Sequence, residues 1–290
     1  MLSLKEVKNF KYRINPTEGI EGRANFGYYV VRPISVYFTW LILQTPMSAN
    51  QVTVLHMIIG ILGSILLAFA DLKVQLAGIF FLYLSYVIDN VDGEVARYRK
   101  QVSITGKYID TLAHTYVIMI MFFGFGFGAF MKTGRVELVV LGFLAGFFSL
   151  RLDVFAMYLE AAQSVKSHLD KNYDYYADVE SKLKGTDALP LQYISKKAKN
   201  RGLRFLFAVF AFPGILHIFA TLLLVELVAR HYGVEFKPVL PSALAVYLYG
   251  ALMPIRRLWT FKKIVSNHET ERIYLKLNGY GQETKTKDPE

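Results

Sequence analysis

The sequence predicts an all-α protein that crosses a membrane several times. Of its 290 residues, 53% are apolar, and they come in long runs. An α-helix needs about 20 consecutive apolar residues to cross the hydrocarbon of a bilayer. Six runs come close to this length, and we expect a transmembrane helix from each of them: residues 51–70, 72–88, 108–131, 136–158, 205–229 and 239–261.

Lysine and arginine residues are concentrated in alternate connections between these runs. They are frequent in the segments 1–32, 97–100, 182–201 and 262–263, and sparse in the other connections. Since cytoplasmic connections are enriched in Lys and Arg, we expect both termini to be cytoplasmic. The net charge of +10 could instead indicate nucleic-acid binding. However, the basic residues flank apolar runs, so we expect no nucleic-acid partner.

The chain before the first predicted span divides into two parts. Residues 1–32 are charged and are expected to form a cytoplasmic arm. The apolar part of residues 33–47 is too short to span a bilayer, and Pro33 suits the start of a helix. We interpret it as an amphipathic helix in the membrane interface, with Tyr37 and Trp40 at headgroup level. An ordinary buried helix is the alternative.

The six predicted spans form one transmembrane domain over residues 48–262. A long polar segment, 160–202, is expected to be cytoplasmic, and residues 263–290 to form a cytoplasmic tail. Several spans contain glycines at short spacing, such as Gly60 and Gly63. These glycines predict a close approach between helices.

Two short stretches around the end of the second span contain most of the residues that are candidates for metal binding and catalysis. Asp89, Asp92, Gly93 and Ala96 follow the spacing i, i+3, i+4 and i+7, so they share one helix face. That face presents two carboxylates beside two residues with almost no side chain. Arg97 follows directly and could neutralise phosphate oxygens.

The second stretch repeats every four residues and predicts one face of the next helix. It presents Gly106, Asp110 and His114. A charge at membrane depth costs about 2.5–3.5 kcal/mol, so we expect the three carboxylates to face a shared cavity that holds a cation. Carboxylate oxygens suit Mg²⁺ or Mn²⁺, and these ions also bind phosphates. A solvated helix end would explain any single residue, but not the whole set at this spacing.

The two stretches resemble the signature of the CDP-alcohol phosphotransferase (CDP-alcohol phosphatidyltransferase) family. That signature is Asp-x2-Asp-Gly-x2-Ala-Arg, about eight residues, then Gly-x3-Asp-x3-Asp. Asn50 and Thr53, at the start of the first span, resemble a frequent Asn-x-x-Thr of the family. The last aspartate of the signature is replaced by His114. Seven positions match in place: Asp89, Asp92, Gly93, Ala96, Arg97, Gly106 and Asp110.

The resemblance implies a multi-pass membrane transferase that faces the cytoplasm and acts in phospholipid or related biosynthesis. It would move a substituted phosphate from a CDP-linked donor to a hydroxyl acceptor and release CMP. At least one substrate would be a lipid, and the protein would be a homodimer. The implied metal ligands are Asp89, Asp92 and Asp110, and His114 is a further candidate ligand because a neutral imidazole can bind metal. The implied donor-binding residues are Asn50, Thr53, Asp89, Gly93, Ala96, Arg97 and Gly106.

The replacement at His114 leaves three interpretations open. A neutral imidazole, with an ordinary pKa of about 6.5, could act with Asp110 as the catalytic base or metal ligand. The enzyme could be active with a different base. Alternatively, the chain could be a non-catalytic homologue that binds CDP or lipid. A membrane transporter is a further alternative, because acids within membranes also mark ion pathways.

The acceptor site is predicted from charges at the ends of later spans. Arg151 and Asp153 lie in or beside the fourth span, and Arg256 and Arg257 lie near the end of the sixth. Charges in spans are candidates for function. The first pair could instead form a structural ion pair, and the second could be a cytoplasmic anchor.

Overall fold

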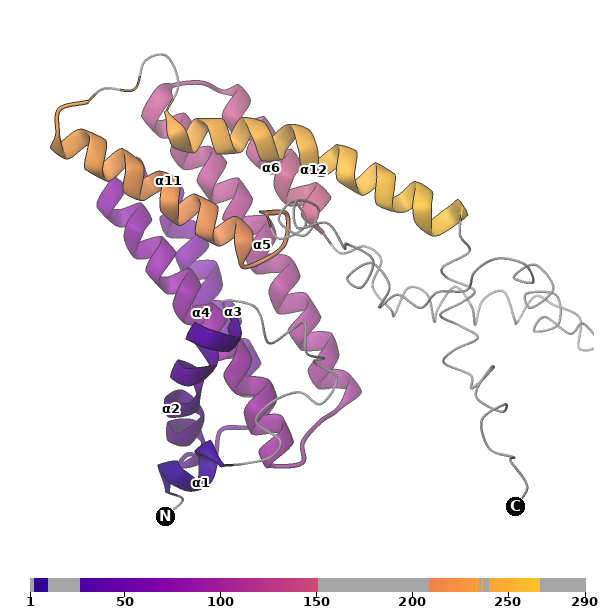
Figure 1. Cartoon of the computed structure of the whole chain (residues 1–290). Coiled ribbons are helices and arrows are strands. Elements are labelled where there is room, and N and C mark those ends of the chain that lie inside the picture. The colour runs from indigo at the N-terminus through magenta and orange to yellow at the C-terminus, as the bar shows by residue number, and fades with distance from the viewer. Residues whose placement is uncertain (1–2, 10–26, 151–208, 235, 237–239, 267–290) are drawn as a thin grey trace, which may run out of the picture. The chain divides into compact units, whose positions relative to one another are not determined.

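The computed structural model describes residues 3–9, 27–150, 209–234, 236 and 240–266, and every regular element in them is helical (Figure 1). The all-α prediction is therefore confirmed for this part of the chain. In chain order the elements are α1 (Leu4–Lys8), the π-helical turn η3 (Gly27–Val31), α2 (Arg32–Leu43), α3 (Ala49–Leu66), α4 (Leu72–Tyr98), α5 (Ile104–Thr133), α6 (Glu137–Ser149), α11 (Gly214–His231) and α12 (Pro241–Ser266).

The chain divides into two compact units. The first comprises Met1–Leu150 and Val209–Pro254, and it contains all the described helices except the end of α12. In the second unit, the described residues are 255–266, which continue α12.

Among the described helices, four are long and apolar enough to cross a membrane, and they indicate an integral membrane protein. They are Ala49–Leu66, Leu72–Tyr98, Thr105–Thr133 and Gly214–His231, which correspond to the first, second, third and fifth predicted spans. The fourth predicted span, 136–158, runs beyond the described residues after α6, and the sixth overlaps α12. The count of six spans, the interfacial helix and the cytoplasmic termini stay predictions.

Two helices show the largest differences in extent from the predicted spans. α4 continues for ten residues past the predicted end at residue 88, through the acidic stretch, to Tyr98. α11 begins only at Gly214, directly after Pro213, although the apolar run begins at residue 205. Hydropathy marks where side chains are apolar, whereas helix ends depend on capping and on proline.

Glycines allow α3 and α4 to pack closely. A Cβ atom on Gly63 would lie 2.8 Å from the carbonyl oxygen of Gly78, and one on Gly60 would lie 2.8 Å from the Ser85 hydroxyl. The predicted close approach of helices at these glycines is therefore confirmed. The N-terminus of α3 is fixed by a capping box between Ser48 and Gln51.

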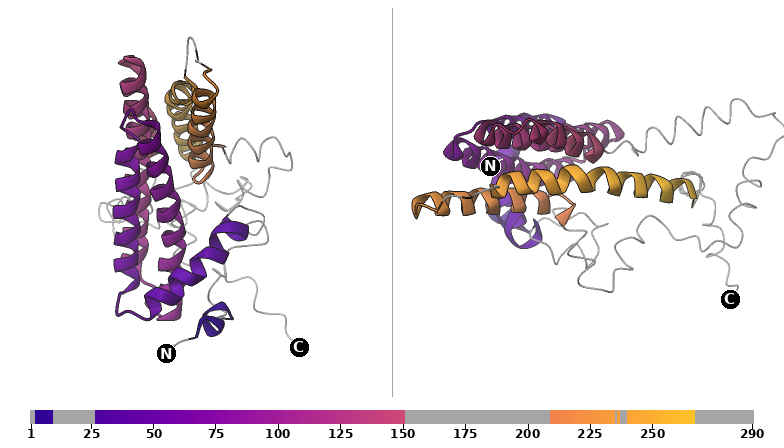
Figure 2. Two further views of the ribbon diagram at one scale, coloured as in Figure 1. Left: turned by 90° about the vertical axis from the view of Figure 1, so that its left-hand side faces the viewer. Right: turned by 90° about the horizontal axis from the view of Figure 1, so that it is seen from above.

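α2 is inclined to α3, α4 and α5 (Figure 2) and is held against α4 by polar contacts. Ser35 and Thr39 donate hydrogen bonds to the carboxylate of Glu94 at 3.0 Å and 2.7 Å. Glu94 is almost fully buried, so these hydroxyl groups compensate for the loss of water around a charged group. On the other face of α2, Tyr37 and Leu41 are exposed. α2 thus has one protein-facing side and one exposed apolar side.

Arg99, just after α4, ties the segment between α2 and α3 to the end of α4. Its guanidinium group donates to the carbonyl oxygens of Met47, of Thr45 at 2.5 Å and of Ile42 at 3.4 Å. The Gln101 side chain accepts a hydrogen bond from the Ala49 amide at 3.4 Å. These contacts place the start of α3 beside the end of α4 and the connection that leads to α5.

The other end of α5 packs on α11 and α12. Phe125 and Phe219 stack with ring centroids 3.8 Å apart. Lys132 and Glu226 form an ion pair at 2.7 Å with only 2% and 1% of their side chains exposed. Glu226 also accepts a hydrogen bond from the Ser242 amide at 2.7 Å, so one carboxylate joins three helices.

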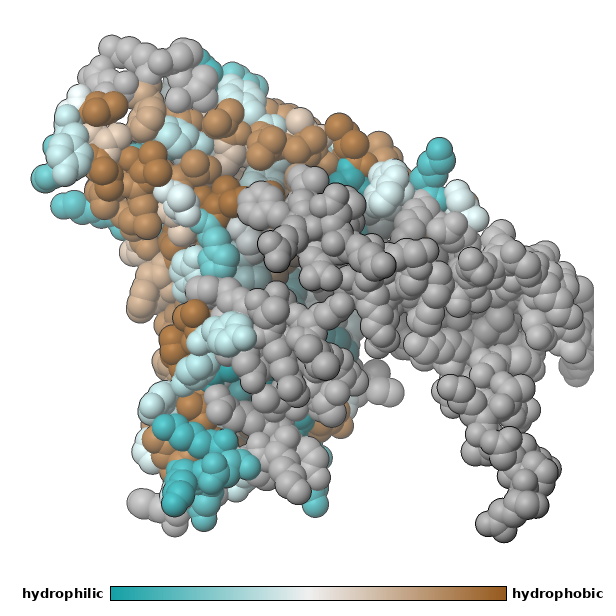
Figure 3. All heavy atoms as spheres, in the orientation of Figure 1, coloured by the Kyte–Doolittle hydropathy of each residue, from teal (hydrophilic) through white to brown (hydrophobic). Residues whose placement is uncertain are grey.

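Large apolar side chains are also exposed on the described helices. Figure 3 shows hydrophobic residues over α11 and α12, and hydrophilic residues gathered near α1. On α3, the exposed residues Val54, Ile58, Leu62 and Ile65 form a stripe along one face. Exposed apolar surface of this extent is expected of helices that contact lipid or another protein chain.

Candidate functional site

A cavity of about 370 Å³ lies between the start of α3, the end of α4 and the start of α5. The predicted metal, donor-binding and catalytic residues of this region all line it: Asn50, Thr53, Asp89, Asp92, Gly93, Ala96, Arg97, Gly106, Asp110 and His114. The helical spacing of the two acidic stretches therefore predicted which side chains share a cavity. Their roles in binding and catalysis stay predictions.

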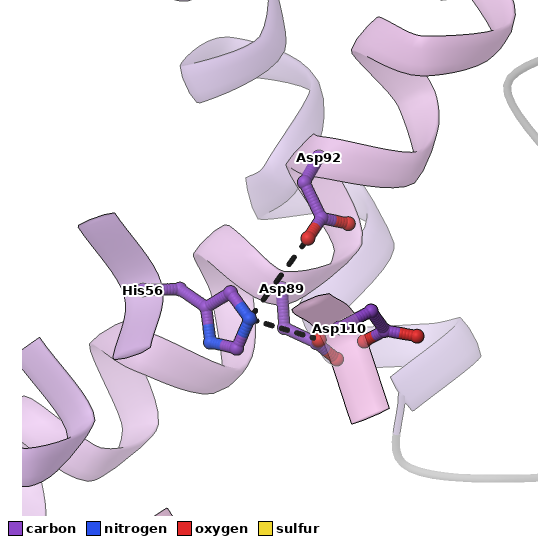
Figure 4. A group of neighbouring side chains, drawn as sticks. All are labelled: His56, Asp89, Asp92 and Asp110. Atoms are coloured by element: carbon purple, nitrogen blue, oxygen red, sulfur yellow. Dashed lines mark ion pairs between the residues drawn. The ribbon is translucent and has the colours of Figure 1, made fainter. Parts of the chain in front are cut away.

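Three of the predicted metal ligands come together with a histidine from α3. Asp89 and Asp92 extend from α4, Asp110 from α5 and His56 from α3 (Figure 4). One possible ligand atom from each of these residues lies within 4.8 Å of all the others. His56 Nε2 is 3.7 Å from Asp89 Oδ1 and 3.9 Å from Asp92 Oδ2. We call this group the carboxylate–histidine cluster.

The cluster fits a divalent metal ion. With ligands at about 2.1 Å, an octahedral ion separates neighbouring ligand atoms by about 3.0 Å and opposite ones by about 4.2 Å. The atoms in the cluster lie close to this range, so small side-chain movements would bring them to one ion. Three carboxylates also supply the negative charge that a divalent ion requires.

His114 contacts two members of the cluster from its position on α5. Its Nε2 atom is 3.1 Å from Asp89 Oδ1 and 3.2 Å from Asp110 Oδ1. Asp110 also accepts a hydrogen bond through Oδ2 from Lys107 Nζ at 2.6 Å. The imidazole is thus held by carboxylates on two helices, at the wall of the cavity.

Thr53 is hydrogen-bonded to Asp92. The Thr53 hydroxyl donates to Asp92 Oδ2 at 2.7 Å, and both side chains are buried. Such a bond fixes the orientation of a carboxylate that is a candidate metal ligand. The structure therefore gives Thr53 a contact to the cluster, in addition to its predicted role in donor binding.

The small residues keep the cavity open beside the helix backbones. A Cβ atom on Gly93 would lie 3.0 Å from Arg97 Nη1, and one on Gly106 would lie 3.0 Å from Asn50 Oδ1. The Gly106 amide belongs to the first turn of α5 and donates to Ser103 Oγ at 3.0 Å. A helix N-terminus and an arginine on the same cavity favour a negatively charged ligand.

Sequence reasoning did not find three residues of the site. Arg32, which is 8% exposed, and Lys107 line the cavity, and His56 belongs to the cluster. A signal for His56 was present, because it lies one turn after Thr53 on the same face of an apolar span. Arg32 could not be found in this way, because the position of α2 depends on tertiary contacts with residues that are distant in sequence, such as Glu94.

The residues that were predicted to bind the acceptor are not among the described residues that line the cavity. Arg151 and Asp153 lie outside the described residues. Arg256 and Arg257 lie on α12 in the second unit of the chain. Their role in acceptor binding stays a prediction.

Apolar helices that could cross a membrane, together with a carboxylate-rich cavity, define an integral membrane protein with a candidate metal site. The sequence model of the CDP-alcohol phosphatidyltransferase family matches residues 46–229, which include the whole carboxylate–histidine cluster. The chain therefore belongs to this family of metal-dependent transferases, and the resemblance seen in its motif is confirmed. A comparison with curated proteins gives no match.

Proposed function

We propose that this protein transfers a substituted phosphate from a CDP-linked donor to a hydroxyl acceptor and releases CMP, with Mg²⁺ or Mn²⁺. The observation that carries the proposal is the convergence of Asp89, Asp92 and Asp110 on one wall of the cavity. A divalent ion held there would supply positive charge to the donor pyrophosphate and to the leaving group. Membership of the family supports the reaction class.

The residues around the cluster are suited to hold the donor. Arg97 supplies a guanidinium group for phosphate oxygens. Gly93, Ala96 and Gly106 leave space for the pyrophosphate to approach the helix backbones. Asn50 lies beside Gly106 and could contact the same ligand. In this arrangement the cavity binds and orients the donor. Most of the rate enhancement would come from the positioning of the substrates and from electrostatic stabilisation of the transition state.

We assign the role of general base to His114. The acceptor hydroxyl gives its proton to the imidazole, its oxygen attacks the phosphorus distal to cytidine, and the bond from that phosphorus to CMP breaks. Contacts to Asp89 and Asp110 support this role, since they would stabilise the imidazolium that forms. Asp110 would act both as metal ligand and as the residue that orients His114.

The surroundings of the site suit a lipid substrate. The cavity lies at the ends of apolar helices, and α2 presents exposed apolar residues beside it. We therefore include in the proposal a multi-pass enzyme of phospholipid or related biosynthesis, with its active site facing the cytoplasm. The exposed apolar face of α3 is compatible with the homodimer that we expect for this family.

The experiment that tests the proposal measures CMP release by the purified protein in lipid vesicles. A panel of CDP-linked donors and hydroxyl acceptors would be tried with Mg²⁺, with Mn²⁺ and with EDTA. Asp110→Ala removes a cluster carboxylate. Asp71→Asn is the matched control, because Asp71 is an exposed residue that caps the opposite end of α4, and asparagine can still accept the capping hydrogen bond.

Three outcomes are distinguishable. Metal-dependent CMP release that is lost in Asp110→Ala and kept in Asp71→Asn would establish the transferase and identify its substrates. Metal-dependent binding of CDP without release from any pair would instead support a non-catalytic homologue. Absence of both binding and release would contradict the proposed function.

A further inference from the structure

His56 is a buried histidine whose Nε2 atom has no hydrogen-bond partner among the described residues. Only 2% of the residue is exposed, and its Nε2 atom is shielded from solvent. A buried polar atom that lacks a partner costs roughly 1–3 kcal/mol, so such an atom calls for an explanation. The family signature, which begins at Asp89, does not include this residue.

The unpartnered nitrogen is directed at the carboxylates of the cluster. Figure 4 shows the ring pointing from α3 toward Asp89 and Asp92, whose nearest oxygens are 3.7 Å and 3.9 Å from Nε2. These distances are too long for hydrogen bonds. They are suitable for two ligand atoms that contact the same metal ion, because the ion lies between them.

His217 offers a comparison within the same chain. Its Nε2 atom is also shielded from solvent. Its Nδ1 atom, however, is hydrogen-bonded to the Tyr83 hydroxyl at 2.5 Å, and its ring stacks on that of Tyr83. His217 is thus explained by packing between α4 and α11, and it lies outside the carboxylate–histidine cluster.

We propose that His56 Nε2 is a metal ligand, so that the site binds its ion through imidazole nitrogen as well as carboxylate oxygen. This inference rests on the proposed function, because it concerns the same metal. It adds a ligand from α3 to the three carboxylates from α4 and α5. The α3 backbone at this position is fixed, since the His56 carbonyl oxygen accepts a hydrogen bond from Ser85 at 2.8 Å.

A nitrogen ligand changes which metal the site prefers. Mg²⁺ is a hard ion that favours oxygen ligands, whereas imidazole suits transition metals. The affinity of such mixed sites rises from Mn²⁺ toward Zn²⁺. A site with His56 as ligand should therefore bind Mn²⁺ more tightly than Mg²⁺. Loss of this ligand should reduce the difference between the affinities for the two ions.

The test is electron spin-echo envelope modulation of bound Mn²⁺, which detects a directly coordinated imidazole nitrogen without any turnover. His114→Asp restores the aspartate that the family signature has at this position, so that among the described residues His56 is the histidine left at the cluster. The second sample is the double variant His56→Asn/His114→Asp. His217→Asn is the control for replacing a partly buried histidine outside the cluster. Mn²⁺ affinity is measured on the same samples, with Mg²⁺ as competitor.

We expect the imidazole nitrogen signal in His114→Asp and its loss in the double variant. We also expect the double variant to bind Mn²⁺ at least about tenfold more weakly than His114→Asp does, because even residues that only orient a metal ligand contribute about this much to affinity. His217→Asn should leave Mn²⁺ binding unchanged. If the double variant does not fold, His56→Gln/His114→Asp takes its place. The presence or absence of the nitrogen signal in His114→Asp remains decisive.

The outcomes separate this inference from the proposed function. Mn²⁺ bound to His114→Asp without a nitrogen signal would overturn the role of His56, although CMP release could still be observed. A nitrogen signal without CMP release would support His56 as a ligand and contradict the transferase. Failure of the wild-type protein to bind Mn²⁺ would contradict the role of His56, and failure to bind Mg²⁺ as well would contradict both proposals.

Discussion

The Nε2 atom of His114 on α5 lies 3.1 Å from Oδ1 of Asp89 on α4. Asp110, one turn before His114, approaches the same nitrogen to 3.2 Å. A histidine held by carboxylates from two helices has little freedom to turn away from the cavity. These contacts connect His114, which departs from the family signature, to Asp89 and Asp110, which match it.

Replacing His114 by alanine should lower kcat of CMP release by about 10²–10⁴-fold, the usual contribution of a general base. His114→Asp should recover part of the lost rate, because a carboxylate can also accept the proton. The rates are measured at saturating donor and acceptor. Full turnover by His114→Ala would show that another group is the base.

Replacing Thr53 by valine should weaken metal binding without removing any ligand. Valine has a similar shape but cannot donate the 2.7 Å hydrogen bond to Asp92. We expect an affinity loss of about 10–100-fold, as for other residues that orient metal ligands. Titration of Mn²⁺ checks this. Thr53→Ser keeps the hydroxyl and should bind Mn²⁺ nearly as the wild type does.

Replacing Gly106 by alanine should impair donor binding more than protein stability. The added Cβ atom would lie 3.0 Å from Asn50 Oδ1 and 3.2 Å from Ser103 Oγ, at the wall of the cavity. We expect KM for the CDP-linked donor to rise roughly tenfold, equivalent to about 1.4 kcal/mol of binding free energy. The melting temperature in detergent serves as control, and a large drop in it would contradict this interpretation.

Replacing Lys132 by methionine should destabilise the fold by about 3–5 kcal/mol, because it leaves Glu226 buried and charged without its cation. The double variant Lys132→Met/Glu226→Gln should recover much of this loss, since glutamine can still accept the hydrogen bond from the Ser242 amide. Thermal unfolding in detergent measures both. Lys73→Met replaces an exposed lysine at the start of α4, and its melting temperature should match that of the wild type.

Periodicity in the sequence was sufficient to predict the faces of α4 and α5 that meet at the cavity. Asp89, Asp92 and Asp110 are brought together by helical spacing on neighbouring helices, which is local information. His56 was not predicted, because its contact with Asp89 depends on how α3 packs against α4. That packing is set by close contacts at Gly60 and Gly63, and their partners cannot be identified from one sequence.

The apolar runs predicted the approximate position of each described long helix but not its ends. Hydropathy falls at Asp89, yet α4 continues to Tyr98 because residues 89–98 contain no proline and because Val91 and Val95 are buried in the packing of this segment. α2 could not be placed in advance either. Its contact with α4 depends on hydrogen bonds from Ser35 and Thr39 to Glu94, whose sequence separations are 59 and 55 residues.

The unbroken course of α4 from Leu72 to Tyr98 restricts how the chain can change in length. One residue inserted between Leu72 and Asp89 would turn the remainder of the helix by about 100°. Asp89 and Asp92 would keep their mutual spacing but would together rotate away from α3 and α5. Insertions and deletions compatible with an intact cavity should therefore be confined to the connections between helices, while the segment from Leu72 to Tyr98 keeps a constant number of residues.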